Sequence, residues 1–332
     1  MKKILLSSAA LLLCFLAHSQ GAKSTGSSAE LTVIPMLELT AGSGASDNSS
    51  GFSLGNSSLY TSFEGSLSEH FSWFVVNHWL SGADFEDPWW PYNSLGYSST
   101  TNWLDFCRAD ISAGNWVFSL GKDMISTGGM EFDDWDWDIR YGLSSPLWND
   151  LPSYQWGGKA AYTTDSENTE LSLQMTTSPW GEHPFSSGLW NYSAMWRGEY
   201  EWFSNIWSIS ALQYAPQKFD YVFVLGQKAD FDSWSVSLDV SNFAGADFDG
   251  AYYHAVKGLA LNGALSFVPS DSFDFSLKGV YSSDYQHIGA LCNWYPGANE
   301  DFRVHAAAVY QPIGKLFTFN IGLTYNFHIH LW

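Results

Sequence analysis

Cysteine, basic residues and long apolar runs are all scarce in this sequence of 332 residues. The 3 cysteines, Cys14, Cys107 and Cys292, are too few for a disulfide framework. After the N-terminal segment there is no run of about eighteen apolar residues, which excludes a membrane-spanning helix. Lysine and arginine together number 14 against 34 acidic residues. This balance argues against nucleic acid as a partner, because nucleic-acid binding depends on basic residues.

Motifs of common metal- and nucleotide-dependent enzymes are also missing. The sequence has no His-Glu-x-x-His, no glycine-rich phosphate loop and no Cys-x-x-Cys. His328 and His330 share one face of an alternating segment, but no third ligand accompanies them, so we interpret them as polar wall residues. We therefore expect neither an enzyme nor a bound cofactor or metal.

The sequence does contain many short segments in which apolar and polar residues alternate. Aromatic residues make up 17% of the chain and charged residues only 14%. In residues 234–241 and 273–281, large apolar side chains alternate with serine, aspartate and lysine. A soluble β-sandwich shows the same period of two, but many segments here reach about nine to eleven residues, the length that crosses a bilayer as a tilted strand. We therefore predict an all-β fold, a transmembrane antiparallel up-and-down β-barrel.

The connections between these segments fall into two classes, short periplasmic turns and long extracellular loops. Tight turns are expected at residues 68–70, 113–115, 165–168, 204–205, 230–233, 269–272 and 312–314. Long connections are expected at residues 42–56, 81–102, 125–153, 179–191, 243–254 and 283–301. The pattern gives about fifteen candidate strands. Bacterial barrels have an even number, so we predict sixteen, within a range of about 14–18.

The N-terminus resembles a secretory signal. Lys2 and Lys3 precede an apolar region too short to cross a membrane, and small residues at Ala17 and Ser19 predict cleavage after residue 19. Residues 20–29 are small and polar and are expected to form a flexible leader, which leaves residues 30–332 for the barrel. This organisation predicts export to the outer membrane of a Gram-negative bacterium.

The last segment alternates without a break from Leu316. Its apolar face includes Leu323, Tyr325 and Phe327. An alternating C-terminal strand with an aromatic residue at or near its end resembles the signal by which the barrel assembly machinery recognises its substrates. Trp332 falls on the polar face, so Phe327 fits the aromatic position better. We expect outer-membrane lipid and the assembly machinery to be partners of this strand.

A family resemblance appears around residues 116–159. Leu120-Gly121-Lys122-Asp123 ends one segment, Gly128-Gly129-Met130-Glu131 follows, and a segment that includes residues 155–159 returns. This pattern resembles outer-membrane porins of the phosphate- and oligosaccharide-selective type, in which a Gly-Lys pair precedes a long loop folded into the lumen. The resemblance implies a channel, but the inward-facing charges here are mixed. It therefore does not extend to phosphate selectivity.

The loop at 125–153 contains the densest run of carboxylates in the sequence. Three interpretations are open: a calcium loop, a constriction that repels anions, and a solvated extracellular loop. Ile139 stands where a calcium loop needs glycine, which weakens the first. The residues that we expect to set a constriction are Arg108, Lys122, Asp123, Glu131, Asp133, Asp134, Asp136, Asp138, Lys159 and Arg197.

The expected function is passive diffusion of small hydrophilic solutes through a weakly cation-preferring, porin-like channel. The alternative is a surface-exposed barrel that binds glycans or a partner through its aromatic, acidic loops. Trp89, Trp90, Trp135 and Trp137 are the candidates for stacking on sugars, although such rings also form the girdle at the membrane surface. Assembly into a homo-oligomer stays open.

Overall fold

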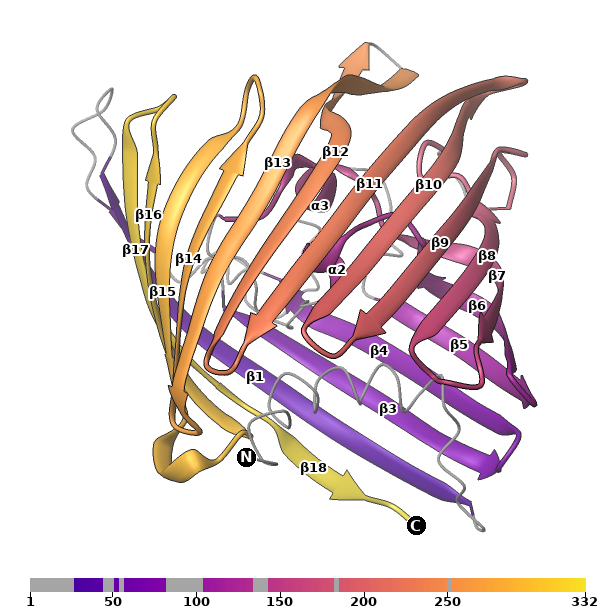
Figure 1. Ribbon diagram of the computed structural model, residues 1–332, viewed down its shortest axis with the longest axis horizontal. Coiled ribbons are helices and arrows are strands. Elements are labelled where there is room, and N and C mark those ends of the chain that lie inside the picture. Colours follow the sequence, from indigo (N-terminus) through magenta and orange to yellow (C-terminus); the bar gives the residue numbers. More distant parts are fainter. Residues whose placement is uncertain are drawn as a thin grey trace.

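The computed structural model describes residues 27–43, 51–53, 57–81, 104–133, 143–181, 185–249 and 252–332, which form a closed antiparallel β-barrel (Figure 1). Its strands are β1 (Ser28–Ser43), β2 (Gly51–Ser53), β3 (Ser58–Ser68), β4 (Phe71–Ser81), β5 (Leu104–Ala113), β6 (Trp116–Met124), β7 (Tyr154–Thr163), β8 (Thr169–Thr177), β9 (Trp190–Tyr200), β10 (Phe203–Ala215), β11 (Lys218–Phe231), β12 (Trp234–Asp249), β13 (Tyr252–Ser270), β14 (Phe273–Tyr281), β15 (Gln286–Trp294), β16 (Phe302–Gln311), β17 (Leu316–Tyr325) and β18 (Phe327–His330). Two short α-helices, α2 (Met130–Asp133) and α3 (Pro146–Asp150), lie between β6 and β7, and a 3-10 turn, η1 (Pro296–Ala298), precedes β16.

The barrel closes where the first strand meets the last. β1 pairs with β3 on one side and with β17 and β18 on the other. β17 and β18 are two parts of one strand interrupted at Asn326, and β2 is a short piece beside β1. Sixteen strands therefore make up the wall, which confirms the predicted fold class and strand number.

The outer face of the wall is apolar. Leu120, Leu173 and Leu277 are 73%, 67% and 57% exposed although they lie in regular strands. The residues that alternate with them, such as Ser119 and Ser172, are buried on the inner side. A continuous exposed band of leucine and aromatic side chains is the surface that lipid covers in a transmembrane barrel.

Most connections match the predicted turns and loops. The turn predicted at residues 204–205 lies at 201–202 instead, because β10 begins at Phe203. The prediction of a long loop at 243–254 is wrong. β12 and β13 continue as a ladder to Asp249 and from Tyr252, with bulges near Phe243 that disturb the alternation.

A second loop prediction, at residues 283–301, is also wrong because this range contains β15. The outward residues of β15 are Ile288, Ala290, Cys292 and Trp294. Leu291 lies between them in sequence and so falls on the other face. Apolar side chains on both faces weaken the alternation of polar and apolar residues. β15 is a strand within residues that the alternation assigned to a loop.

β1 begins at Ser28, inside the predicted leader, and residues 1–26 lie outside the described part of the chain. Within the described ranges, none of the helices is long and apolar enough to cross a membrane.

Candidate constriction inside the barrel

The connection between β6 and β7, residues 125–153, is here called the inner loop, and its described parts, residues 125–133 and 143–153, fold into the lumen. Figure 1 shows α2 and α3 inside the barrel, behind β10 to β13. α2 contacts β11 and β12, and α3 contacts β12, on the wall face that carries Val224 and Asp239. These two helices thus narrow the lumen beside β11 and β12.

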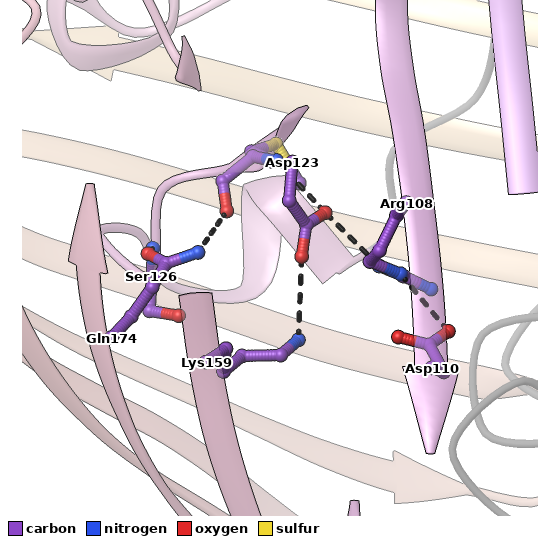
Figure 2. Close-up of polar contacts among 7 residues, drawn as sticks. Arg108, Asp110, Asp123, Ser126, Lys159 and Gln174 are labelled. Atoms are coloured by element: carbon purple, nitrogen blue, oxygen red, sulfur yellow. Dashed lines mark hydrogen bonds and ion pairs between the residues drawn. The ribbon is translucent and has the colours of Figure 1, made fainter. Parts of the chain in front are cut away.

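An ionic cluster holds the start of this loop (Figure 2). The carboxylate of Asp123 accepts a hydrogen bond from Arg108 Nη1 at 3.0 Å and lies 3.7 Å from Lys159 Nζ. Arg108 Nε donates to Asp110 at 3.1 Å. Gly121, with φ of +136°, pairs with Arg108, and a Cβ at Gly121 would lie 2.0 Å from the carbonyl oxygen of Cys107. Only glycine therefore fits beside the arginine at this position.

Gln174 on β8 fastens the backbone that follows this cluster. Its Oε1 accepts from Ser126 N at 2.6 Å, and its Nε2 donates to the carbonyl oxygen of Met124 at 3.0 Å (Figure 2). One amide side chain thus satisfies both a donor and an acceptor of the loop backbone, as buried polar groups require.

Hydroxyl groups continue the contact along β9 and β10. Thr127 Oγ1 lies within hydrogen-bond distance of Ser193 and Ser210. Ser208 Oγ both accepts from Gly128 N at 3.0 Å and donates to the carbonyl oxygen of Gly128 at 2.9 Å. The loop backbone is therefore bonded to the wall at several successive residues before α2 begins.

Asp239 on β12 holds the first turn of α2. Its Oδ1 accepts from Met130 N at 2.7 Å and its Oδ2 from Glu131 N at 2.8 Å. Gly226 on β11 makes room for this contact, since a Cβ there would lie 2.6 Å from Asp239 Oδ1 and 2.7 Å from Met130 N. Free N–H groups at the start of a helix need such an acceptor.

Glu131 joins the two arms of the inner loop to the wall. Its Oε1 accepts from Ser145 N at 2.9 Å and from Lys278 Nζ on β14 at 3.1 Å. Asp133, two residues later, pairs with Arg197 on β9. These carboxylates act as counterions of basic wall residues.

An apolar cluster packs the same region of the inner loop against the wall. Phe132 of α2 and Leu147 and Leu151 around α3 pack with Trp180, Leu212, Val222, Val224 and Phe243. Burial of such side chains contributes about 1.5–3 kcal/mol each. The inner loop is thus packed against the wall as well as hydrogen-bonded to it.

The second arm of the loop crosses to the opposite strands. Leu143 packs on Ala307 and Val309 of β16, and a Cβ at Gly289 of β15 would lie 2.7 Å from its side chain. Ser145 caps α3 by accepting from Trp148 N at 3.2 Å. The described parts of the loop therefore contact the wall from β8 to β16.

α3 carries one titratable group in an unusual setting. Asp150 Oδ2 accepts from Ala246 N at 3.4 Å, and burial raises the pKa of this carboxyl above its ordinary value of 3.8, with the charge of Asp247 acting in the same direction. Burial also raises the pKa of Tyr285, whose hydroxyl accepts from Asn149 Nδ2 at 3.0 Å.

The predicted constriction residues do not all meet. Arg108, Asp123 and Lys159 form a first ionic cluster at the start of the inner loop. Glu131, Asp133 and Arg197 lie in a second ionic cluster, around α2. Lys122 is buried and pairs in register with Cys107, and its ammonium group donates to the carbonyl oxygen of Leu104 at 2.6 Å. It takes no part in the lumenal clusters. The remaining candidates, Asp134, Asp136, Asp138, Trp89, Trp90, Trp135 and Trp137, lie outside the described residues.

Sequence reasoning missed the residues that hold the loop. Gln174, Ser208 and Asp239 each sit at a polar position of an alternating strand, like many other wall residues. Nothing local distinguishes Asp239, because its partners lie about a hundred residues earlier in the chain. The available signal was Gly226, a glycine at an inward position of β11, which indicates close approach of another backbone.

A Gly-x-Ser-x-Gly spacing, which marks the nucleophile of α/β-hydrolases, occurs at residues 51–55. Gly51–Ser53 form β2, which pairs antiparallel with β1. The next element of the described chain is the strand β3, whereas the motif requires a helix after the serine.

The predicted assembly strand is divided. Leu323 and Tyr325 lie in β17, and Phe327 begins β18 after the interruption at Asn326. Leu323 and Phe327 are exposed on the outer face. The strand pairs with β1 throughout both parts.

Comparison with solved structures shows that the fold is similar to that of outer-membrane porins. A triple mutant of the porin of Rhodopseudomonas blastica superposes with a TM-score of 0.60 at 11% identity, covering 90% of this chain and 100% of that one. A loop-deletion mutant of OmpT, an outer membrane protein of Vibrio cholerae, gives 0.57 at 9% identity, covering 90% and 99%. The sequence matches no protein family and no curated protein sequence. The predicted resemblance to outer-membrane porins is confirmed for the fold, and at this identity the comparison does not distinguish one kind of porin from another.

Proposed function

We propose that this barrel is a porin-like channel of the bacterial outer membrane, through which small hydrophilic solutes diffuse passively. The observation that carries the proposal is the inner loop, whose described parts lie inside a sixteen-stranded wall and are bonded to it at both ends. A barrel of this size encloses an aqueous lumen unless something fills it. A loop that contacts the wall from β8 to β16 narrows such a lumen, and this supports a size-limited passage.

We further propose that the channel weakly prefers cations. In the two ionic clusters, the carboxylates are Asp110, Asp123, Glu131, Asp133, Glu170, Glu199 and Asp239, and the basic groups are Arg108, Lys159, Arg197, Lys228 and Lys278. The clusters are nearly compensated, with two acids in excess. Fixed charge acts on a passing ion only within about a Debye length, roughly 8 Å at physiological salt, so this small excess supports a weak preference.

Reconstitution of the purified, detergent-folded chain in a planar bilayer tests both proposals. We expect discrete conductance steps that scale with salt concentration, and a reversal potential that favours cations slightly in a salt gradient. Folded barrel that inserts into the bilayer without conducting would contradict the channel. Anion preference would contradict the second proposal and leave the first intact.

A further inference from the structure

Two imidazoles and two carboxylates meet at the seam where the first and last strands close the barrel. They are Glu30 of β1, His328 and His330 of β18, and Asp301 in the turn before β16. β18 pairs with β1 and lies past the start of β16, because β16 begins opposite the last residue of β17 (Figure 1). The cluster therefore lies at the rim of the wall, beyond the strands that cross the membrane, where water reaches it.

His328 has a carboxylate at each of its two ring nitrogens. Its Nδ1 lies 2.6 Å from Glu30 Oε1, and its Nε2 lies 3.1 Å from Asp301 Oδ1. A neutral imidazole carries a hydrogen on only one nitrogen, so it would turn a lone pair toward one of these carboxylates. The protonated ring donates to both. The geometry therefore favours the imidazolium form, which joins β1 to the turn before β16.

Most of the other charges in this part of the seam are negative. The charged and titratable groups near the three bonded residues are His330 of β18, Glu64 opposite Glu30 on β3, and Glu300 and Arg303 on either side of Asp301 in sequence. A neutral ring at residue 328 would leave the carboxylates of Glu30 and Asp301 without the cation between them. Partial burial lowers the pKa of His328, but its hydrogen bond to Glu30 and the charge of Asp301 outweigh this effect and raise the pKa above the ordinary value of 6.5.

The two partners of His328 lie at opposite edges of its ring, so they do not converge on one point. Among the described residues, no three histidine, cysteine, aspartate or glutamate side chains are grouped so that they could hold a metal ion. The ligand that this arrangement fits is therefore a proton on the imidazole.

We propose that His328 is a pH-dependent clasp of the barrel seam, which closes when the imidazolium binds Glu30 of β1 and Asp301 of the turn before β16 together. The stabilisation is fully present below the pKa of histidine in an unfolded chain, about 6.5, and is lost as the pH rises through the higher pKa of the folded chain. The clasp determines how firmly the ends of β1 and β18 are held. It does not depend on whether the barrel conducts.

Amide hydrogen exchange in the folded, vesicle-embedded barrel tests the clasp. Ala29 N–H donates to the carbonyl oxygen of Trp332, and Leu331 N–H donates to that of Ala29, so both amides report on the seam. After correction for the intrinsic effect of pH on exchange, we expect both to be about fivefold better protected at pH 5.5 than at pH 8.5. Asp230 N–H, which donates to Trp202 at another turn, is the internal control, because β9 to β12 contain no histidine.

Three variants assign the effect to one imidazole. His328→Gln cannot gain a proton, so its seam should be weakly protected at both pH values. His328→Arg keeps a cation between the two carboxylates at both, so its protection should be high and independent of pH, and it stays informative if the ends of the strands fray in His328→Gln. His330→Gln is the matched control, because His330 is 80% exposed and lies beside Glu30 alone of the two carboxylates.

Protection of the seam that does not change with pH in the unmodified chain would overturn the proposal. A pH dependence that survives in His328→Gln would also overturn it, because another group would then be responsible. Loss of the pH dependence in His330→Gln but not in His328→Gln would assign the effect to the wrong ring and have the same result.

Discussion

Single glycines let side chains of one strand lie flat across the next strand. Asp239 reaches across Gly226 to the inner loop. In the same way His305 reaches across Gly322 to Glu38, with 3.1 Å between His305 Nε2 and Glu38 Oε2, and a Cβ at Gly322 would lie 2.6 Å from the imidazole ring. Inward glycines therefore fix the positions of charged groups inside this barrel.

We predict that Gly226→Ala loosens the inner loop. The added Cβ would collide with Asp239 Oδ1 and Met130 N, and overpacking of this kind costs about 1–3 kcal/mol. Amide hydrogen exchange in residues 125–133, followed by mass spectrometry, should accelerate by about an order of magnitude. Gly279→Ala is the control, because its Cβ would face outward with the nearest atom at 4.0 Å. Equal exchange in both variants would mean that Gly226 does not determine how the loop docks.

At the scale of elements, α3 has a pH-dependent contact with β12. Because burial raises the pKa of Asp150, the protonated carboxyl fits the packed state better than the charged one. The stabilisation of the packed helix is fully present below the ordinary value of 3.8 and is lost as the pH rises through the raised value. α3 should therefore be held more firmly in acid than at neutral pH.

This predicts quieter currents in acid. Open-channel noise should fall when the pH is lowered from about 7 to about 4, and Asp150→Asn, which cannot ionise, should show low noise at both values. Noise that varies with pH to the same extent in Asp150→Asn would show that another group is responsible.

The last strand is the second element that can be tested directly. Leu323 is exposed on the outer face of β17, so Leu323→Arg places a charge in lipid at a cost of about 2–4 kcal/mol. We expect little heat-modifiable barrel in the outer membrane. Thr318→Arg, which faces inward and is less tightly enclosed than the buried Thr324, should assemble. Normal assembly of Leu323→Arg would contradict the outward placement.

Alternation along single strands made most of these elements predictable. It identified the wall and the loop at 125–153, since each depends on local period and turn residues. The even strand number came instead from the rule for bacterial barrels, applied to about fifteen candidate segments. It failed at β15, whose two faces are both partly apolar, and at the bulged ends of β12 and β13. The attachment of the inner loop could not be predicted, because contacts such as Met130 with Asp239 join residues that only the closed barrel brings together.

At the scale of the whole molecule, the pairing of acids with wall cations determines how selectivity should respond to mutation. Asp133→Asn removes the carboxylate that is hydrogen-bonded to Arg197 and leaves Glu170 and Glu199 as its neighbouring acids, so the reversal potential in a salt gradient should move toward anions. Arg197→Gln leaves Asp133 uncompensated and should move it toward cations by a similar amount. If neither variant changes the reversal potential, the pair lies outside the range at which it affects the passing ion.

The pairing of β1 with β17 and β18 has a consequence for how the chain folds. The pair Glu30 and His330 joins nearly the two ends of the barrel sequence, so the final ladder has the largest loop-closure entropy of any in the molecule. A chain emerging from its N-terminus exposes an unpaired edge on β1 until the last residues arrive, and such an edge is prone to pair with other chains. Folding as the chain is made is therefore disfavoured, and loss of β17 and β18 would leave two open edges, on β1 and β16, rather than a smaller barrel.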